Sequence, residues 1–185
     1  MSRIVTPASI QASPTKSQPL LEAVQKQLGM VPNLFKTLAQ SPAVLQFYLQ
    51  QGEALAGGTL SSELREQIAL VTAGANGCDY CASAHTLIGK GAGLAPAEMA
   101  NNLRGSAADA KTQAALDFAK AVVQDRGHLS DAQLQAVRAA GFSDAEVLEL
   151  IASVVANIFT NYVNNIAATV VDFPLVRTTE VKVAA

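Results

Sequence analysis

The chain has 185 residues, which suits a single domain and is long enough to bury a sizeable core. Half of the residues are hydrophobic, only 15% are charged and the mean hydropathy is +0.24, so disorder over most of the chain is excluded. The formal net charge is −2, and no Lys/Arg block indicates a partner such as nucleic acid or an anionic membrane. With so few charged residues, much of the surface has to be uncharged. This favours a homo-oligomer, in which part of that surface is buried between subunits.

Helix signals recur along the chain, and its 34 alanines are the best helix formers, so we predict an all-α fold. Residues 1–16 are polar and rich in Pro, Ser and Thr, which is typical of a tail or arm. Residues 17–174 are predicted to form one domain, and residues 175–185 an extended tail. The capping residues, prolines and glycines place the helices at 20–28, after Pro32, 42–56, 62–75, 78–89, 96–105, 106–127, 130–141 and 143–172.

Neither the first residues nor the most hydrophobic stretch of the chain indicates a membrane segment. The first residues contain no apolar run long enough for a signal-peptide core. The most hydrophobic stretch, residues 147–171, is interrupted by Glu149 and four asparagines, which a spanning helix would not carry. We therefore expect a cytoplasmic protein, in which reducing conditions keep a cysteine pair as thiols or cycle it.

A possible internal repeat appears when the chain is shifted by 83 residues. Seven of the 21 positions from 66 to 86 are then identical to those from 149 to 169, although three of the seven are alanine. The same shift places Cys78 on Asn161 and Cys81 on Asn164. The hypothesis is a duplicated helical hairpin, at 62–90 and 145–173, of which only the first copy retains thiols.

The two cysteines and a histidine carry the clearest chemical signal. If Cys78 begins a helix, Cys81 and His85 follow at steps of three and four residues and lie on the same face. A thiol in the first turn of a helix, within a CxxC sequence, has a lowered pKa, and its thiolate can attack a peroxide or a disulfide. Asp79 opposes that effect by adding a negative charge nearby.

Helix arithmetic brings Glu66 to the same place. In an antiparallel hairpin with its turn at residues 76–77, Glu66 lies roughly 15 Å and His85 roughly 12 Å from the turn, so the two side chains are level. Cys81 is one turn nearer the bend. The order Glu66, His85, Cys81 is that of a carboxylate that orients a base serving a thiol. Burial among small apolar residues would raise the Glu66 pKa and make it a usable proton carrier.

The chain resembles the AhpD-like alkylhydroperoxidases of the carboxymuconolactone decarboxylase superfamily in one motif. The motif is a glutamate (Glu66), eleven residues, Cys78-x-x-Cys81, three residues and a histidine (His85). The sequences at 29–33, 41–42, 161–164 and 172–174 are similar to the superfamily's peroxidase-related subgroup, so the resemblance covers most of the chain after residue 17. One position departs from the pattern. The best-known members have a second histidine between the cysteines, where this chain has Tyr80, so a relay through that histidine is not available.

The resemblance implies an AhpD-like helical bundle, often trimeric or hexameric, and a thiol peroxidase that acts on organic or hydrogen peroxides. Cys81 would attack the peroxide, Cys78 would resolve the sulfenic acid to a disulfide, and Glu66 and His85 would form the proton relay. An external dithiol, on a lipoyl- or thioredoxin-type protein, would reduce the disulfide. No cofactor and no metal ion is implied, and lactone decarboxylation is disfavoured because the decarboxylases lack the cysteine pair.

Other interpretations remain open at this stage. Two small buried cysteines can be inert core residues, and two thiolates with His85 and Glu66 would make four metal ligands, although structural zinc sites are usually richer in Cys and His. Glu66 can be structural, since Glu149 recurs at the matching position without thiols. The alternative function is a non-enzymatic CxxC redox sensor or a helical assembly module. The physiological peroxide, the reductant, the oligomer size and the effect of Tyr80 on turnover are not fixed by the sequence.

Overall fold

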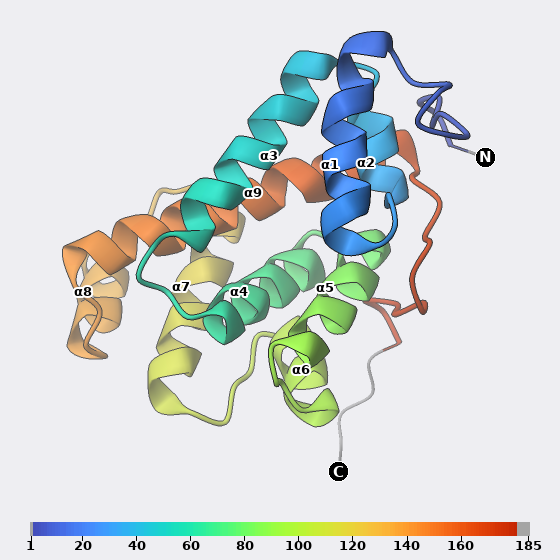
Figure 1. Cartoon of the computed structure of the whole chain (residues 1–185). Helices are drawn as coiled ribbons and strands as arrows, with labels where there is room; N and C mark the ends of the chain where they lie inside the picture. Colours follow the sequence, from blue (N-terminus) through green and yellow to red (C-terminus); the bar gives the residue numbers. More distant parts are fainter. Residues whose placement is uncertain (1, 181–185) are drawn as a thin grey trace.

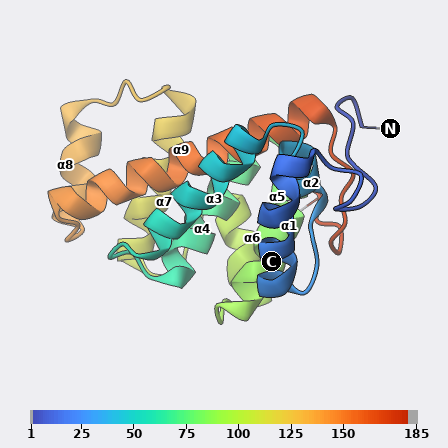
Figure 2. The same ribbon diagram turned by 45° about the horizontal axis from the view of Figure 1, so that its top comes forward.

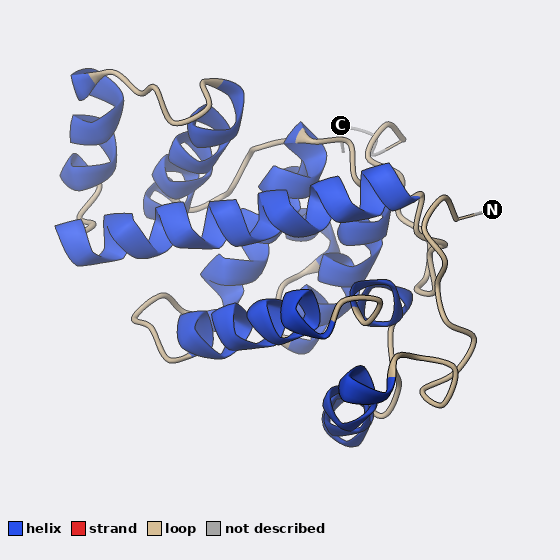
Figure 3. Cartoon of the chain, turned by 90° about the horizontal axis from the view of Figure 1, so that it is seen from above, coloured by secondary structure: helices blue, strands red, loops and turns tan. Residues whose placement is uncertain are grey.

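In a computed structural model, which describes residues 2–180, those residues form nine α-helices and one 3-10 helix, and none of them is in a strand (Figures 1 and 3). The all-α prediction is therefore confirmed. The elements are η1 Thr15–Ser17, α1 Gln18–Leu28, α2 Asn33–Leu38, α3 Pro42–Ala56, α4 Ser62–Ala75, α5 Asp79–Gly91, α6 Pro96–Leu103, α7 Ala110–Gln124, α8 Asp131–Ala139 and α9 Asp144–Ala167.

Helix α4 is the centre of the fold. It packs against α5, α6, α7 and α9, and every residue from Gln67 to Ala73 is buried. Its sequence is apolar on nearly all sides there, as expected for a helix surrounded by others. Leu70 faces a hydrophobic cluster shared with α1, α2, α3, α5 and α6, whereas Ile68 faces a second cluster shared with α7, α8 and α9. Figure 1 shows α4 near the centre of the molecule, with α3 above it, α7 to its left and α6 below.

Helix α9 is the longest element and crosses the whole molecule (Figure 2). By length and composition alone it would be able to span a membrane. In the fold it packs against α3, α4, α5 and α7, with Leu150 and Val154 fully buried. Two of its polar residues, Asn161 and Asn164, are also buried, and they face α4 and α5 near the cysteines.

Most predicted helix starts are confirmed, because caps depend on local sequence. Ser61 caps α4, and Ser130 and Ser143 form capping boxes at α8 and α9. The start at Ser106 is wrong: α7 begins at Ala110, and Asp109 is its cap, accepting the Thr112 N–H at 2.8 Å. A carboxylate suits the positive end of the helix, and Gln113 fixes the preceding turn by bonding to the backbone of residues 105 and 107.

The duplicated-hairpin hypothesis is wrong. Residues 62–90 form two helices, separated by a turn at residues 76–78 in which Gly77 has φ 61°. The aligned segment forms one continuous helix from Asp144 to Ala167, and the position that matches Gly77 is Thr160. A threonine does not favour the positive φ of that turn, so the second helix continues. It ends at Ala167 rather than near residue 172, with Ala168 in a left-handed conformation.

The two ends of the described chain run beside the helices instead of extending away (Figure 1). The Arg3 N–H bonds to the Ala167 carbonyl at 2.6 Å. The C-terminal segment, residues 168–180, returns along α5: the Val176 N–H bonds to Ser83 Oγ, and the Thr178 N–H and hydroxyl both bond to Asp79 Oδ1, each at 2.9 Å. Of the predicted C-terminal tail, residues 181–185 lie outside the described residues.

A close helix contact at Gly74 gives a test of the fold. A methyl group there would overlap the backbone carbonyl oxygen of Leu103 at the end of α6. We expect Gly74→Ala to lower the free energy of unfolding by about 2 kcal/mol, since backbone atoms must move apart. Gly52→Ala, in α3 with no atom within 4 Å, is the control and should raise it by about 0.5–1 kcal/mol. Urea unfolding of both variants measures the effect, and equal changes would contradict the packing described.

Candidate active site

The two cysteines lie at the beginning of α5, as the sequence predicts. Cys78 is the N-cap residue, and its sulfur accepts the Cys81 N–H at 3.3 Å. Cys81 lies in the first turn, its Sγ 2.8 Å from that of Cys78, and both are free thiols. Cys78 is fully buried and Cys81 is 2% exposed, so neither sulfur lies on the outer surface.

The environment makes the two thiols chemically unequal. The hydrogen bond from Cys78 contributes most to lowering the Cys81 pKa, to about 6; burial opposes it, and the His85 charge assists. The same hydrogen bond, together with burial, raises the Cys78 pKa above its usual value. Cys81 is therefore the thiolate near neutral pH, and Cys78 is the protonated donor that stabilises it.

Two asparagines of α9 complete the environment of Cys81, and the sequence predicted no catalytic role for them. The Asn164 side chain donates from Nδ2 to Cys81 Sγ at 3.3 Å. Asn161, whose Oδ1 accepts from Asn76 Nδ2 at 2.9 Å, also lowers the Cys81 pKa. The 83-residue alignment had already paired Asn164 with Cys81. In the fold, Asn164 and Cys81 contact each other, and they are not equivalent positions of a repeat.

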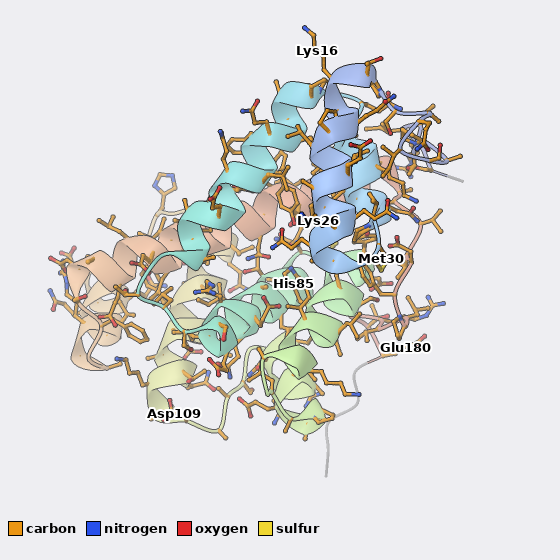
Figure 4. The ribbon with its side chains drawn as sticks, in the orientation of Figure 1. Lys16, Lys26, Met30, His85, Asp109 and Glu180 are labelled. Atoms are coloured by element: carbon orange, nitrogen blue, oxygen red, sulfur yellow. The ribbon has the colours of Figure 1, made fainter. Side chains whose placement is uncertain are left out.

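His85 and Glu66 meet as the helix arithmetic predicts. His85 Nδ1 lies 2.8 Å from Glu66 Oε2, across the α4–α5 contact. Burial alone would lower the His85 pKa, but the charge and hydrogen bond of Glu66 raise it above its usual value, and the Cys81 charge adds to that. Because Nδ1 faces the carboxylate, Nε2 is the ring atom left to exchange a proton with a substrate. Figure 4 shows His85 inside the outline of the molecule, among the central helices.

Two tyrosines border the site, and they differ in role. Tyr80 packs its ring on Phe173, 5.5 Å between centroids, and its hydroxyl accepts the Leu34 N–H at 3.0 Å, so it anchors α2. Tyr48 of α3 was missed by the sequence analysis. Burial, followed by the charges of Cys81 and Glu66, raises its pKa to about 12, so its hydroxyl stays neutral. No local motif marks Tyr48, since only the packing of α3 brings it near.

Two pockets adjoin the site, and His85, Tyr48 and Thr160 line both. The first, of about 340 Å³, is apolar and contacts Cys81. Its walls come from the chain between α1 and α2, from α2 and α5, and from the C-terminal segment, and they include Met30, Phe35, Leu87, Ile88 and Phe173. The second, of about 160 Å³, contacts Glu66 and has a mixed lining that is more polar than that of the first; we call it the polar pocket. Cys81 is therefore approached through an apolar pocket and Glu66 through a polar one.

The four residues named from the sequence, Glu66, Cys78, Cys81 and His85, thus lie in one connected site. Across residues 2–180, no three His, Cys, Asp or Glu side chains gather in a way that could hold a metal ion. The arrangement offers one thiolate, one thiol placed to form a disulfide with it, and a His–Glu pair able to move a proton. An all-α protein with a buried CxxC dithiol beside a His–Glu pair is the class that fold and site define.

The comparisons with known proteins agree with that class. Residues 42–125, from the start of α3 to just past α7, match the carboxymuconolactone decarboxylase family, and this range contains all four site residues. Taken together, this match and the structural similarities below support assignment of the chain to the AhpD-like carboxymuconolactone decarboxylase superfamily. A search of curated proteins found no significant match.

Solved structures match the chain over nearly its whole length. An uncharacterized peroxidase-related protein from Ralstonia eutropha JMP134, with an alkylhydroperoxidase AhpD core, is 28% identical, with a TM-score of 0.83 over 92% of both chains. A second, from Silicibacter sp. TM1040, is 26% identical, with a TM-score of 0.80 over 91% of both. The debrominase Bmp8 is 21% identical, with a TM-score of 0.77 over 91% of this chain and 92% of that one, and shows the fold alone.

The hydrogen bond from Asn164 gives a prediction about the thiolate. Replacing it in Asn164→Ala removes a donor to a charged sulfur, so we expect the Cys81 pKa to rise from about 6 by about one pH unit. Because a thiol with a lowered pKa is ionised above that pKa, the thiolate absorbance near neutral pH should fall. Ultraviolet titration measures it. Asn165→Ala is the control, since the Asn165 amide donates to the Asn76 carbonyl and not to sulfur. A midpoint that moves equally in both variants would contradict the assignment.

Proposed function

We propose that the protein is a thiol-dependent peroxidase that reduces organic or hydrogen peroxides through a Cys78–Cys81 dithiol/disulfide cycle. The observation that carries the proposal is the Cys81 thiolate, of pKa about 6, at the end of an apolar pocket and beside the His85–Glu66 pair. The match to the family over residues 42–125 and the similarity to peroxidase-related proteins support it.

The proposed cycle uses each group once. The Cys81 thiolate attacks the terminal oxygen of the peroxide, the O–O bond breaks, and His85 gives a proton to the departing alkoxide, which leaves as an alcohol. Cys81 is then a sulfenic acid. The Cys78 thiol attacks it, the S–O bond breaks, and the hydroxide leaves with the Cys78 proton as water. The hydrogen bond to the Cys81 thiolate, which is the largest cause of the raised Cys78 pKa, is lost once Cys81 is a sulfenic acid, so Cys78 becomes a better nucleophile for this step.

An external dithiol then reduces the disulfide by two exchange steps, which return a thiol to Cys78 and a thiolate to Cys81 and release one proton to solvent. His85 takes up a proton before the next turnover. Both sulfurs are buried, so the reductant has to reach Cys81 through the apolar pocket. A dithiol on a slender arm, such as a lipoyl group, fits that approach better than the flat surface of a thioredoxin-type protein. We therefore favour a lipoyl-bearing partner.

The apolar residues that α9 leaves exposed support homo-oligomeric assembly as part of the same proposal. Leu148, Val155, Tyr162 and Ile166 are each more than half exposed and recur at intervals of seven or four residues along one face. A contiguous apolar helix face is typical of an interaction surface.

A second candidate function is reductive removal of a halogen from an apolar ring, which needs the same two electrons. An aryl bromide and two thiols give the arene, a disulfide, bromide and a proton. Four aromatic side chains, Phe35, Tyr48, Tyr80 and Phe173, line the pocket that contacts Cys81 and suit a flat ring. Bromide release from a brominated pyrrole, measured beside peroxide consumption with the same reductant, separates the two functions.

Substitution of each of the two cysteines should change the activity in a different way. Cys81→Ser removes the attacking thiolate, so stopped-flow oxidation by cumene hydroperoxide should be lost. Cys78→Ser should keep a single oxidation event, because Cys81 remains, but should lose turnover with dihydrolipoamide. If Cys81→Ser consumes peroxide as fast as the parent, the proposal fails. A reversible disulfide in the parent, without turnover on any dithiol, would favour the redox-sensor alternative.

Glu66 and Glu149 form a matched pair for testing the proton relay. Glu66 contacts His85, whereas Glu149 accepts the N–H groups of Thr59 and Leu60 and the Thr59 hydroxyl. We expect Glu66→Gln to lower the rate of Cys81 oxidation by about 100-fold, since the His85 proton loses its carboxylate. Glu149→Gln should lower the melting temperature but leave that rate unchanged. If both variants lose stability and keep the rate, Glu66 is structural.

A further inference from the structure

The polar pocket beside Glu66 has no role in the cycle described above, yet it reaches the same histidine. Its walls come from α3, α4 and α9 and include Gln51, Arg65, Glu66, Ser153 and Asn157. The apolar pocket at Cys81 shares only His85, Tyr48 and Thr160 with it. These three side chains therefore separate the pocket that leads to the Cys81 thiolate from the pocket that leads to the Glu66 carboxylate.

Two residues that line this pocket each have a buried side-chain atom with no hydrogen-bond partner among the described protein atoms. These atoms are Nε2 of Gln51, on α3, and Oγ of Ser153, on α9. Ser153 is only 3% exposed. An unpaired buried polar group costs about 1–3 kcal/mol, and water removes that cost where a pocket has room and several polar partners. About 160 Å³ is enough for several water molecules.

The cycle also requires His85 to take up a proton, and the apolar pocket offers few polar groups to deliver one. His85 loses one proton to the alkoxide and must regain one in each turnover. Its Nδ1 faces Glu66, and the pocket at Cys81 is filled by the peroxide or by the reductant when protons move. Few polar groups line that pocket to carry a proton to solvent. The Glu66 side chain, 16% exposed, is the other member of the pair, and both it and the His85 side chain, 21% exposed, line the polar pocket.

We propose that the polar pocket between α3, α4 and α9 is a hydrated proton inlet, in which Ser153 and Gln51 are positioning residues that order water against Glu66. This inference rests on the proposed function for its role in turnover. The inlet itself is a property of the protein at rest. Water enters on the Glu66 side and peroxide on the Cys81 side, and His85 connects the two.

The test measures proton access without requiring turnover. Residues His85 and His128 are the only histidines of the chain, and His128 is exposed. Nitrogen-15 spectra of histidine-labelled full-length protein can therefore follow exchange of the His85 ring proton with water, with His128 as internal reference. Ala156→Leu fills the polar pocket and changes no polar atom, whereas Ser153→Ala removes the unpaired hydroxyl. Ala84→Leu fills the apolar pocket as the matched control.

We expect Ala156→Leu to slow exchange of the His85 proton by about tenfold, and Ser153→Ala to slow it less, while Ala84→Leu leaves it unchanged. In turnover, Ala156→Leu should lower kcat for hydrogen peroxide and cumene hydroperoxide by the same factor, with a larger solvent deuterium isotope effect and unchanged KM. Ala84→Leu should raise KM for cumene hydroperoxide only. Unchanged exchange in both polar-pocket variants, or equal slowing in Ala84→Leu, would overturn the inlet. If the proposed function is wrong, the result is different: the parent protein exchanges its His85 proton with water but consumes no peroxide.

Discussion

The packing of α4 on every side is the constraint on which the site depends. With α5, α6, α7 and α9 against it, α4 cannot rotate without exposing residues of both hydrophobic clusters. Glu66 is therefore fixed where α4 faces α5 and the polar pocket. Gly89 of α5 lies beside Glu66 at this contact: a methyl group there would make an ordinary contact of 3.7 Å with the Glu66 Cβ and tighter contacts with Met99 and Leu94. The 2.8 Å contact between Glu66 and His85 follows from that register.

The thiolate at Cys81 is stabilised mainly by neutral donors. The Cys78 thiol contributes most and the asparagine amides contribute least, while the one cation, His85, acts in between and is itself neutralised by Glu66. A thiolate held by dipoles stays reactive without a strong fixed positive charge. Asp79, expected to oppose ionisation of the attacking thiol, instead raises the pKa of Cys78, and its carboxylate accepts two hydrogen bonds from Thr178.

The sequence predicted what depends on neighbouring residues and missed what depends on packing. Ser61, Ser130 and Ser143 were recognisable because a cap bonds within three residues. The meeting of Glu66 and His85 was predictable because both lie in one hairpin, joined by a short turn. Tyr48 and Asn164 reach the site from α3 and α9, and no local pattern encodes those helix contacts. The false repeat arose because buried helices share a composition, whereas a single glycine at residue 77 decides whether the helix turns.

The C-terminal quarter of the chain has a consequence for how the protein is made. Cys81 leaves the ribosome about 80 residues before Asn161 and Asn164, which lower its pKa, and almost 100 before Thr178, which binds Asp79. A nascent chain shorter than this lacks part of the environment that ionises the thiol. The cysteine therefore acquires its full acidity only after α9 has been synthesised and has docked, so premature oxidation of the emerging chain is disfavoured.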